Sequence, residues 1–276
     1  MKTALILLNY NDSEAVKKAL ERVQGFSSID RVIIVDNDSE ESSRKELERV
    51  SGTVIWNDKN GGYGYGNNRG VQAAAEAGCE LSLIANPDAV FTEETVEHLV
   101  SAFADTEVAA AGALMEGKPA RDCAFPLLGF KDELLFSGPV LKRIFRRRVQ
   151  YPASFFRALP KEVGAVHGSL LMVRNRDFLS VGGFDERFFL FCEEKVLGKK
   201  FRDAGKRTVL TKAVYSHAGS ETMKKNGFRM VDRQRIRQDS EMLYYKEYLH
   251  ASKSGIFAAK MLQAVVMLET RIISGK

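Results

Sequence analysis

The chain has 276 residues, of which 45% are hydrophobic and 28% charged, a composition typical of a globular protein with one large domain. No uncharged apolar run approaches the roughly 18 to 20 residues that cross a bilayer, and three scattered cysteines argue against a disulfide or zinc framework. Residues 224–276 hold 11 Lys and Arg against 5 Asp and Glu, so the positive net charge of +5 comes from this C-terminal part. We expect no nucleic-acid partner.

Residues 3–110 alternate short aliphatic runs with helical stretches, the pattern of βαβ units and a mostly parallel sheet flanked by helices. The predicted strands end at Leu8, Val35, Trp56 and Ala85. The predicted helices cover residues 13–23, 42–50, 68–77 and 92–103, the last with Thr92 as its N-cap. The fold class is therefore α/β.

The regular pattern stops between about residues 116 and 162, where five prolines stand among apolar and basic residues. We interpret this segment as a variable insertion. Order resumes with a strand over residues 164–173, a helix over 188–204 and a last strand over 208–215. We expect a catalytic domain over residues 1–219 and a basic helical extension over 220–276.

Small acids and amides follow three of the predicted strands. Asn9-Tyr10-Asn11-Asp12 follows Leu8, Asp36-Asn37-Asp38-Ser39 follows Val35, and Asn86-Pro87-Asp88 follows Ala85. The carboxyl ends of parallel strands meet at one edge of a sheet, where open α/β folds bind their ligands. The sequence thus predicts a polar pocket at this edge, in which Asp88 is the candidate metal ligand.

A glycine-rich stretch runs from Asn60 to Gly70 and precedes a predicted helix. Glycines let backbone amides approach a phosphate or ribose closely. Gly62, Gly64 and Gly66 do not complete a dinucleotide-binding fingerprint, because Asn67 occupies its third position. A tight turn packed on the sheet is the alternative interpretation.

Together with Gly182-Gly183-Phe184-Asp185-Glu186-Arg187-Phe188-Phe189, Glu193-Glu194 and Ser216-His217, these segments resemble family 2 glycosyltransferases. The likeness is closer to the bacterial rhamnosyltransferase-like branch that builds surface polysaccharides, and it covers roughly residues 2–220. It implies the GT-A fold, a nucleotide-sugar donor and Mg²⁺ or Mn²⁺. It also divides the catalytic domain into a nucleotide-sugar-binding part (about 1–110), the insertion (about 116–162) and an acceptor and base part (about 163–219).

The resemblance assigns donor binding to Asn9, Tyr10, Asp36, Asn37, Asn60, Gly61, Gly66, Asn68, Asn86 and Asp88. Asp36 would accept a hydrogen bond from the pyrimidine ring, since a carboxylate suits a ring N–H. Asp88 would bind the metal in an Asp-X-Asp-like motif whose first acid is Asn86 here, and His217 would be a second ligand. The donor diphosphate and water would complete the octahedral shell.

The general base lies in a segment that departs from the family pattern. The family has Glu-Asp-Val-Asp where this chain has Glu193-Glu194-Lys195-Val196, so Glu194 takes the position of the base. An ordinary acidic helix N-terminus is the alternative for Glu193 and Glu194. The acceptor side is assigned to Gly183, Phe184 and Asp185, whereas His98 and His167 lack such context, and we expect them to be non-functional.

The predicted function is that of an inverting glycosyltransferase, which moves a sugar from a dTDP- or UDP-sugar to a hydroxyl of an acceptor. The predicted acceptor is a lipid-linked saccharide in bacterial cell-surface polysaccharide synthesis. Two alternatives stay open. One is a degenerate protein that binds a nucleotide sugar without turnover, because Val196 replaces the family's second Asp. The other is an NAD-dependent oxidoreductase that uses the glycine-rich stretch.

The basic tail suggests a partner surface. A predicted helix places an apolar stripe beside three cations, which suits an interfacial helix on anionic lipid; the stripe is Phe257, Met261, Val265, Leu268 and Ile272, and the cations are Lys253, Lys260 and Arg271. The alternative is a helix that packs on the catalytic domain or on a second subunit in a homodimer. Because no basic-then-apolar leader precedes the first predicted strand, we expect a cytoplasmic protein, peripheral on the inner face of the membrane.

Overall fold

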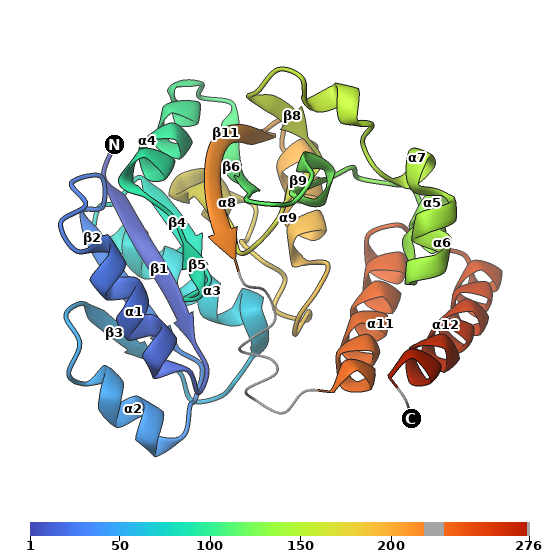
Figure 1. Cartoon of the computed structure of the whole chain (residues 1–276), viewed down its shortest axis with the longest axis horizontal. Helices are drawn as coiled ribbons and strands as arrows, with labels where there is room; N and C mark the ends of the chain where they lie inside the picture. Colours follow the sequence, from blue (N-terminus) through green and yellow to red (C-terminus); the bar gives the residue numbers. More distant parts are fainter. Residues whose placement is uncertain (218–228, 275–276) are drawn as a thin grey trace.

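The computed structural model describes residues 1–217 and 229–274, so the domain boundary expected between residues 219 and 220 lies outside the described residues. A mixed sheet forms the centre of the fold, in the strand order β3-β2-β1-β4-β10-β6-β11-β5, with β8 also paired to β11 (Figure 1). Its strands are β1 (Thr3–Asn9), β2 (Arg31–Asp36), β3 (Thr53–Trp56), β4 (Leu81–Ala85), β5 (Ala89–Val90), β6 (Val108–Met115), β8 (Lys161–Val163), β10 (Leu170–Arg174) and β11 (Arg207–His217). A small second sheet pairs β7 (Ala124–Phe125) with β9 (Ala165–Val166).

The N-terminal half of the sheet is parallel, as the βαβ pattern predicts. Strand β1 lies between β2 and β4, and Asn9 is the register partner of Asp36 at the carboxyl end. Strand β10 runs antiparallel between β4 and β6, with Leu170 opposite Ala85. The residues that precede β10 therefore lie beside those that follow β4, a juxtaposition that assembles the candidate site.

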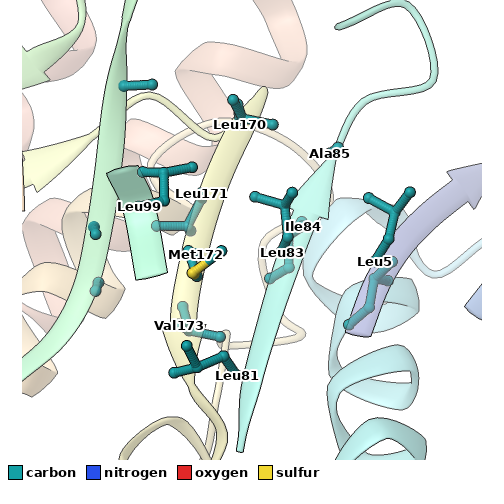
Figure 2. Close-up of a cluster of buried hydrophobic side chains, with 14 of the residues drawn as sticks. Leu5, Leu81, Leu83, Ile84, Ala85, Leu99, Leu170, Leu171, Met172 and Val173 are labelled. Carbon is teal, nitrogen blue, oxygen red and sulfur yellow. The ribbon is translucent and has the colours of Figure 1, made fainter. Parts of the chain in front are cut away.

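The core forms where strands from distant parts of the sequence meet. Figure 2 shows Leu5 of β1, Leu83 of β4 and Met172 of β10 with Leu99 of α4 (Glu93–Ser101), all of them buried. Removing an aliphatic side chain of this size from water contributes about 1.5 to 3 kcal/mol. Thr92 caps α4 as predicted, since its hydroxyl accepts the Thr95 N–H at 3.3 Å. These contacts fix the strand ends that carry the polar residues.

The glycine-rich stretch is part of a helix, which corrects the sequence prediction. Helix α3 (Gly62–Glu76) begins six residues before the expected start. A Cβ atom on Gly66 would lie 2.2 Å from Cδ1 of Leu8, and one on Gly70 would lie 2.5 Å from Cγ2 of Ile6. The glycines therefore let α3 pack closely against the sheet, while the approach of backbone amides in this stretch to a phosphate or ribose stays a prediction.

The other helices follow the prediction with shifted boundaries. Helices α1 (Ser13–Val23) and α2 (Glu41–Leu47) match the first two predicted stretches, and α8 (Asn175–Ser180) follows β10. Helix α9 (Glu193–Asp203) begins five residues later than expected, because Phe191 and Cys192 have φ of 74° and 70°, a left-handed conformation that no α-helix contains. The late start places Glu193 and Glu194 in the first turn of α9.

The insertion and the C-terminal extension form one helical lobe at the end of the molecule opposite β3 (Figure 1). This lobe consists of α5 (Phe130–Phe136), α6 (Pro139–Ile144), α7 (Arg146–Val149), α11 (Met230–Glu247) and α12 (Lys253–Ile273). Tyr244, Tyr245 and Ala259 are buried there with Phe188 and with Val196 of α9 in a second hydrophobic core. The lobe thus packs directly on the helix that carries the predicted base.

No helix within residues 1–217 and 229–274 is long and apolar enough to cross a membrane. The three cysteines are free thiols, of which Cys79 and Cys123 are buried. Burial raises the pKa of both thiols, which favours the neutral, unreactive form.

Candidate functional site

Asp88 and His217 meet although 129 positions separate them in the sequence. Residues 86 to 89 form a tight turn closed by the Ala89 N–H to the Asn86 carbonyl at 2.9 Å, and His217 at the end of β11 pairs with Ala89. Nε2 of His217 lies 3.1 Å from Oδ1 of Asp88 and 3.4 Å from Nδ2 of Asn86. Strand pairing thereby brings both predicted metal ligands to one point.

The chemistry of this pair fits a divalent metal. The carboxylate oxygen of Asp88 and the imidazole nitrogen of His217 are both protein ligands of divalent metals, and a hydrogen bond of 3.1 Å holds them together. Within the part of the chain that the structure describes, no group of three His, Cys, Asp or Glu residues could hold a metal. The remaining ligands would therefore come from the diphosphate and water, as the sequence predicts.

A cavity of about 530 Å³ opens beside the Asp88–His217 pair. Its walls come from α1, from the turn after β4, from the segment after β6 and from the end of β11. Lys18 and Arg22 contribute positive charge to one wall, while Asp12, Glu14 and Glu116 contribute negative charge. The cavity has room for a small polar ligand beside the candidate metal ligands.

The predicted base is held at the start of α9 by the loop before β10. Oε1 of Glu194 accepts the Gly168 N–H at 3.1 Å, and the Tyr63 hydroxyl donates to the Gly168 carbonyl at 2.7 Å. A Cβ atom on residue 168 would lie 2.7 Å from Oε1 of Glu194, so only glycine allows this approach. Gly168 therefore fixes the position of the Glu194 carboxylate.

Glu193 differs from its neighbour because it is almost completely buried. Its Oε1 atom has no hydrogen-bond partner among the described residues. Burial, and after it the charge of Glu194, raises the pKa of Glu193 well above its usual value. Glu193 is therefore favoured as a neutral acid behind Glu194, and it is shielded from any acceptor.

His167 lies near the metal pair and the base, although we expected it to be non-functional. Its ring lies 6.2 Å from that of His217, and its Nδ1 accepts the Ser169 N–H at 3.2 Å. Burial lowers the pKa of His167, while the nearby charge of Glu194 raises it. The sequence signal that could have placed His167 here is its position just before β10, once β10 is known to pair antiparallel with β4.

The residues predicted to bind the pyrimidine of the donor form a buried network at the ends of β1 and β2. Oδ1 of Asp36 accepts the Asn9 amide at 2.8 Å, Oδ2 accepts the Ser39 N–H at 3.0 Å, and Arg44 Nε lies 3.5 Å from Oδ2. Asp36 is fully buried, whereas Tyr10 is half-buried. The pyrimidine contact of Asp36 stays a prediction that requires Asn9 or Ser39 to move.

Asn37 and Asn60 secure the start of α3. The Asn37 amide donates to the Gly62 carbonyl at 2.9 Å, and Oδ1 of Asn60 accepts the Gly62 N–H at 3.1 Å. A Cβ atom on Gly61 would lie 2.4 Å from the Tyr65 ring. Donor contacts by this group and by the buried Gly66 therefore stay predictions, beside structural roles that the contacts establish.

Asn68 and the predicted acceptor residues instead hold the loop before α9. The Asn68 side chain both accepts the Phe184 N–H and donates to the Phe184 carbonyl, each at 2.9 Å, while its donor contact stays a prediction. Phe184 is buried, and a Cβ atom on Gly183 would lie 2.6 Å from Oδ1 of Asn68. The acceptor contacts of Gly183 and Phe184 therefore stay predictions, beside the structural roles that these contacts establish.

Asp185 ties this loop to the helical lobe. Its carboxylate accepts hydrogen bonds from Arg187 and from the hydroxyl of Tyr248, the residue after α11, each at 2.7 Å. Burial would raise its pKa, but these two donors outweigh burial and lower the pKa of Asp185 to about 2. With its oxygens engaged in this way, Asp185 supports the lobe interface, and its predicted acceptor contact stays a prediction.

Comparison with known structures defines the class of fold. The mannosyltransferase PcManGT of Pyrobaculum calidifontis, solved with GDP-Man and Mn²⁺, matches with a TM-score of 0.60 at 14% identity, over 99% of this chain and 73% of that protein. The match confirms the predicted GT-A fold.

The family model described as glycosyl transferase family 2 matches residues 4–163, and the chain belongs to this family. It is 25% identical over 201 residues to the low-salt glycan biosynthesis hexosyltransferase Agl10 of Haloferax volcanii, a match to 69% of this chain and 58% of that protein. It is 23% identical over 245 residues to the rhamnosyltransferase WbbL of Escherichia coli, covering 82% of this chain and 88% of WbbL. The similarity to WbbL agrees with the rhamnosyltransferase-like branch that the motifs predicted.

Proposed function

We propose that the protein is a metal-dependent inverting glycosyltransferase that moves a sugar from a dTDP- or UDP-sugar to a saccharide hydroxyl. The observation that carries the proposal is the 3.1 Å approach of His217 to Asp88 beside a charged cavity. Membership of glycosyltransferase family 2 supports the reaction class. Family membership also argues against an NAD-dependent oxidoreductase. The helical conformation of the glycine-rich stretch argues against it as well.

Glu194 is the proposed general base. It would take the proton of the acceptor hydroxyl, whose oxygen attacks the anomeric carbon as the nucleoside diphosphate leaves from the opposite face. A neutral Glu193 behind it would keep a second negative charge out of the site. Asp88 and His217 would hold Mg²⁺ or Mn²⁺, which when bound neutralises charge on the diphosphate.

The acceptor in this proposal is a lipid-linked saccharide of bacterial cell-surface polysaccharide synthesis. The similarity to WbbL, named as a rhamnosyltransferase, supports the transfer of a sugar. We place the enzyme in the cytoplasm, peripheral on the inner face of the membrane, with its basic C-terminal helices toward the lipid. A homodimer through α12 is the alternative arrangement.

The second candidate function is a nucleotide-sugar-binding protein without turnover. The observation that favours it is the substitution of the family's second Asp by Val196, which is buried in the lobe core and offers no polar group. Such a protein would bind a donor without transferring its sugar.

A thermal-shift screen of UDP, dTDP and GDP, each with and without Mn²⁺, tests the proposal. A nucleotide at 100 times its dissociation constant adds about 2.7 kcal/mol to the free energy of unfolding. We expect UDP or dTDP to stabilise the protein only when Mn²⁺ is present, and Asp88→Asn to remove the effect of Mn²⁺. Equal stabilisation with and without metal would contradict the metal site. Metal-dependent binding of UDP-sugars with neither transfer nor hydrolysis would favour the second candidate.

A further inference from the structure

Helix α12 exposes an apolar stripe that nothing in the described structure covers. Its five members are between 58% and 80% exposed: Phe257, Met261, Val265, Leu268 and Ile272. At 100° per residue they lie within an arc of about 80° along one side of the helix. Single exposed apolar side chains are ordinary, but a continuous stripe marks a surface with a partner.

The opposite side of α12 shows that the helix is already anchored. Ala259 and Val266 are buried, and a Cβ atom on Gly138, just before α6, would lie 2.8 Å from Cγ2 of Val266. Gln263 exchanges hydrogen bonds with Gln238 of α11 at 2.8 and 3.2 Å. Since packing on the lobe uses this opposite side, the expectation that the stripe itself packs on the catalytic domain is wrong.

The charge pattern around the stripe indicates the partner. Lys253, Lys260 and Arg271 follow one border of the stripe and are exposed. Their aliphatic stems can lie along apolar surface while their charged ends reach outward. A row of cations beside an apolar stripe complements a bilayer surface, where anionic head groups adjoin hydrocarbon.

A second exposed segment of the same lobe repeats this combination. In α6 and α7, Ile144 is 67% exposed and Phe145 is 37% exposed. Arg143, Arg146 and Arg147 beside them are also exposed. Both segments belong to the lobe in which α6 lies next to α12 (Figure 1).

A second copy of the chain suits the stripe less well. In an antiparallel pair of α12 helices related by a two-fold axis, like borders of the two stripes meet. Lys253 and Lys260 of one copy would then face the cation border of the other, and like charges at such spacing repel. Charge complementarity therefore favours lipid over self-association.

We propose that α12, with α6 and α7, is a membrane-docking face that binds a bilayer containing anionic lipid. The lobe that carries this face is fixed to α9 by the Lys195–Glu133 ion pair at 2.6 Å. It is also fixed to the loop before α9, because the Ser240 hydroxyl donates to the Leu190 carbonyl at 2.7 Å. Docking would thus hold α9 at a set position relative to the bilayer. That consequence rests on the proposed glycosyltransferase with a lipid-linked acceptor, whereas lipid binding itself does not.

Vesicle sedimentation with the full chain tests this face. We expect binding to vesicles rich in phosphatidylglycerol, weaker binding at high salt, and little binding to pure phosphatidylcholine. Each cation near an anionic surface contributes about a fivefold change in partitioning. The Lys253→Glu/Lys260→Glu/Arg271→Glu variant should therefore lose at least about a hundredfold in binding.

A matched variant controls for net charge. Arg31→Glu/Lys45→Glu/Arg49→Glu changes three exposed cations of the catalytic domain, at the other end of the molecule. This control should retain most of its binding, whereas Phe257→Ser/Leu268→Ser/Ile272→Ser should lose it. All variants should keep the stabilisation by UDP and Mn²⁺, so that a failure of docking is distinguishable from a failure of the proposed function.

Three outcomes would overturn the proposal. The full chain could fail to bind anionic vesicles, or the control could weaken binding as much as the α12 charge variant does. Alternatively, sedimentation velocity could show a dimer that the triple serine variant dissociates while its vesicle binding persists. The last result would assign the stripe to a second copy of the chain.

Discussion

The candidate site has two parts that are built by different kinds of contact. The first is the pair Asp88 and His217, and the second is the pair Glu193 and Glu194. Strand pairing assembles the first, because β5 and β11 align Ala89 with His217. Helix packing assembles the second, since the lobe core closes over Val196 of α9. We infer that the metal ligands depend on the sheet alone, whereas the base depends on the lobe, and four predictions test this difference.

The largest effect should follow a change in the metal pair. Asp88→Asn keeps the shape of the side chain but removes its charge, and we expect transfer to fall at least about a thousandfold, since a metal supplies several kcal/mol of charge stabilisation. The matched control is Asp38→Asn, just after β2. The Asp38 side chain is exposed, and its carboxylate forms a long ion pair of 3.8 Å with Arg44. Transfer assays with Mn²⁺ decide the matter; similar losses in the two variants would remove the special role of Asp88.

The two glutamates should differ sharply in their contribution to the rate. We expect Glu194→Gln to slow transfer by a factor on the order of 10² to 10⁴ with donor affinity nearly unchanged, as for loss of a positioned base. Glu193→Gln should matter much less, because an amide resembles the neutral acid that burial favours. Single-turnover rates and calorimetric donor titrations measure both quantities. An inactive Glu193 variant beside an active Glu194 variant would show that the base is misassigned.

The dependence of the base on the lobe can be tested at the Lys195–Glu133 pair, whose side chains are only 12% and 4% exposed. Glu133→Ala leaves a buried lysine without this partner, which destabilises a protein by about 3 to 5 kcal/mol. The matched control is Asp203→Ala on α9, the helix that carries Lys195. It breaks a more exposed ion pair with Lys199 and should cost at most about 0.5 kcal/mol. Urea denaturation followed by circular dichroism gives both values. Equal losses would mean that the lobe does not support α9 through this pair.

The smallest effect concerns Asp185 and depends on pH. Its pKa is lowered from 3.8 to about 2 in the folded protein, so its contribution is present above pH 4 and disappears as the pH falls toward 2. Asp185→Asn should therefore reduce the free energy of unfolding by about 2 kcal/mol at pH 7, and the difference from the wild type should vanish near pH 2. Parallel urea titrations across this range test the sign. A difference that grows on acidification would contradict the assignment.

The sequence sufficed where a signal was local. The aliphatic runs predicted the strand ends at Trp56 and Ala85. The second run is contiguous because β4 is buried on both faces, whereas β3 is a partly exposed edge strand. The family resemblance predicted the acid after β4 and the histidine that ends β11 as metal ligands, and the structure brings them together. A polar residue directly after a buried strand lies at the edge of the sheet.

Only the tertiary structure decided what depends on contacts between distant segments. Glycines that look like a phosphate loop are helix residues pressed on Leu8 and Ile6, and Asn68 is occupied by the backbone of Phe184. His167 enters the site because β10 runs antiparallel to β4, a direction that residue periodicity does not encode. The sequence thus determined the elements and the residue types at their ends, while the pairing of strands and the packing of the lobe determined which of those residues can meet a ligand.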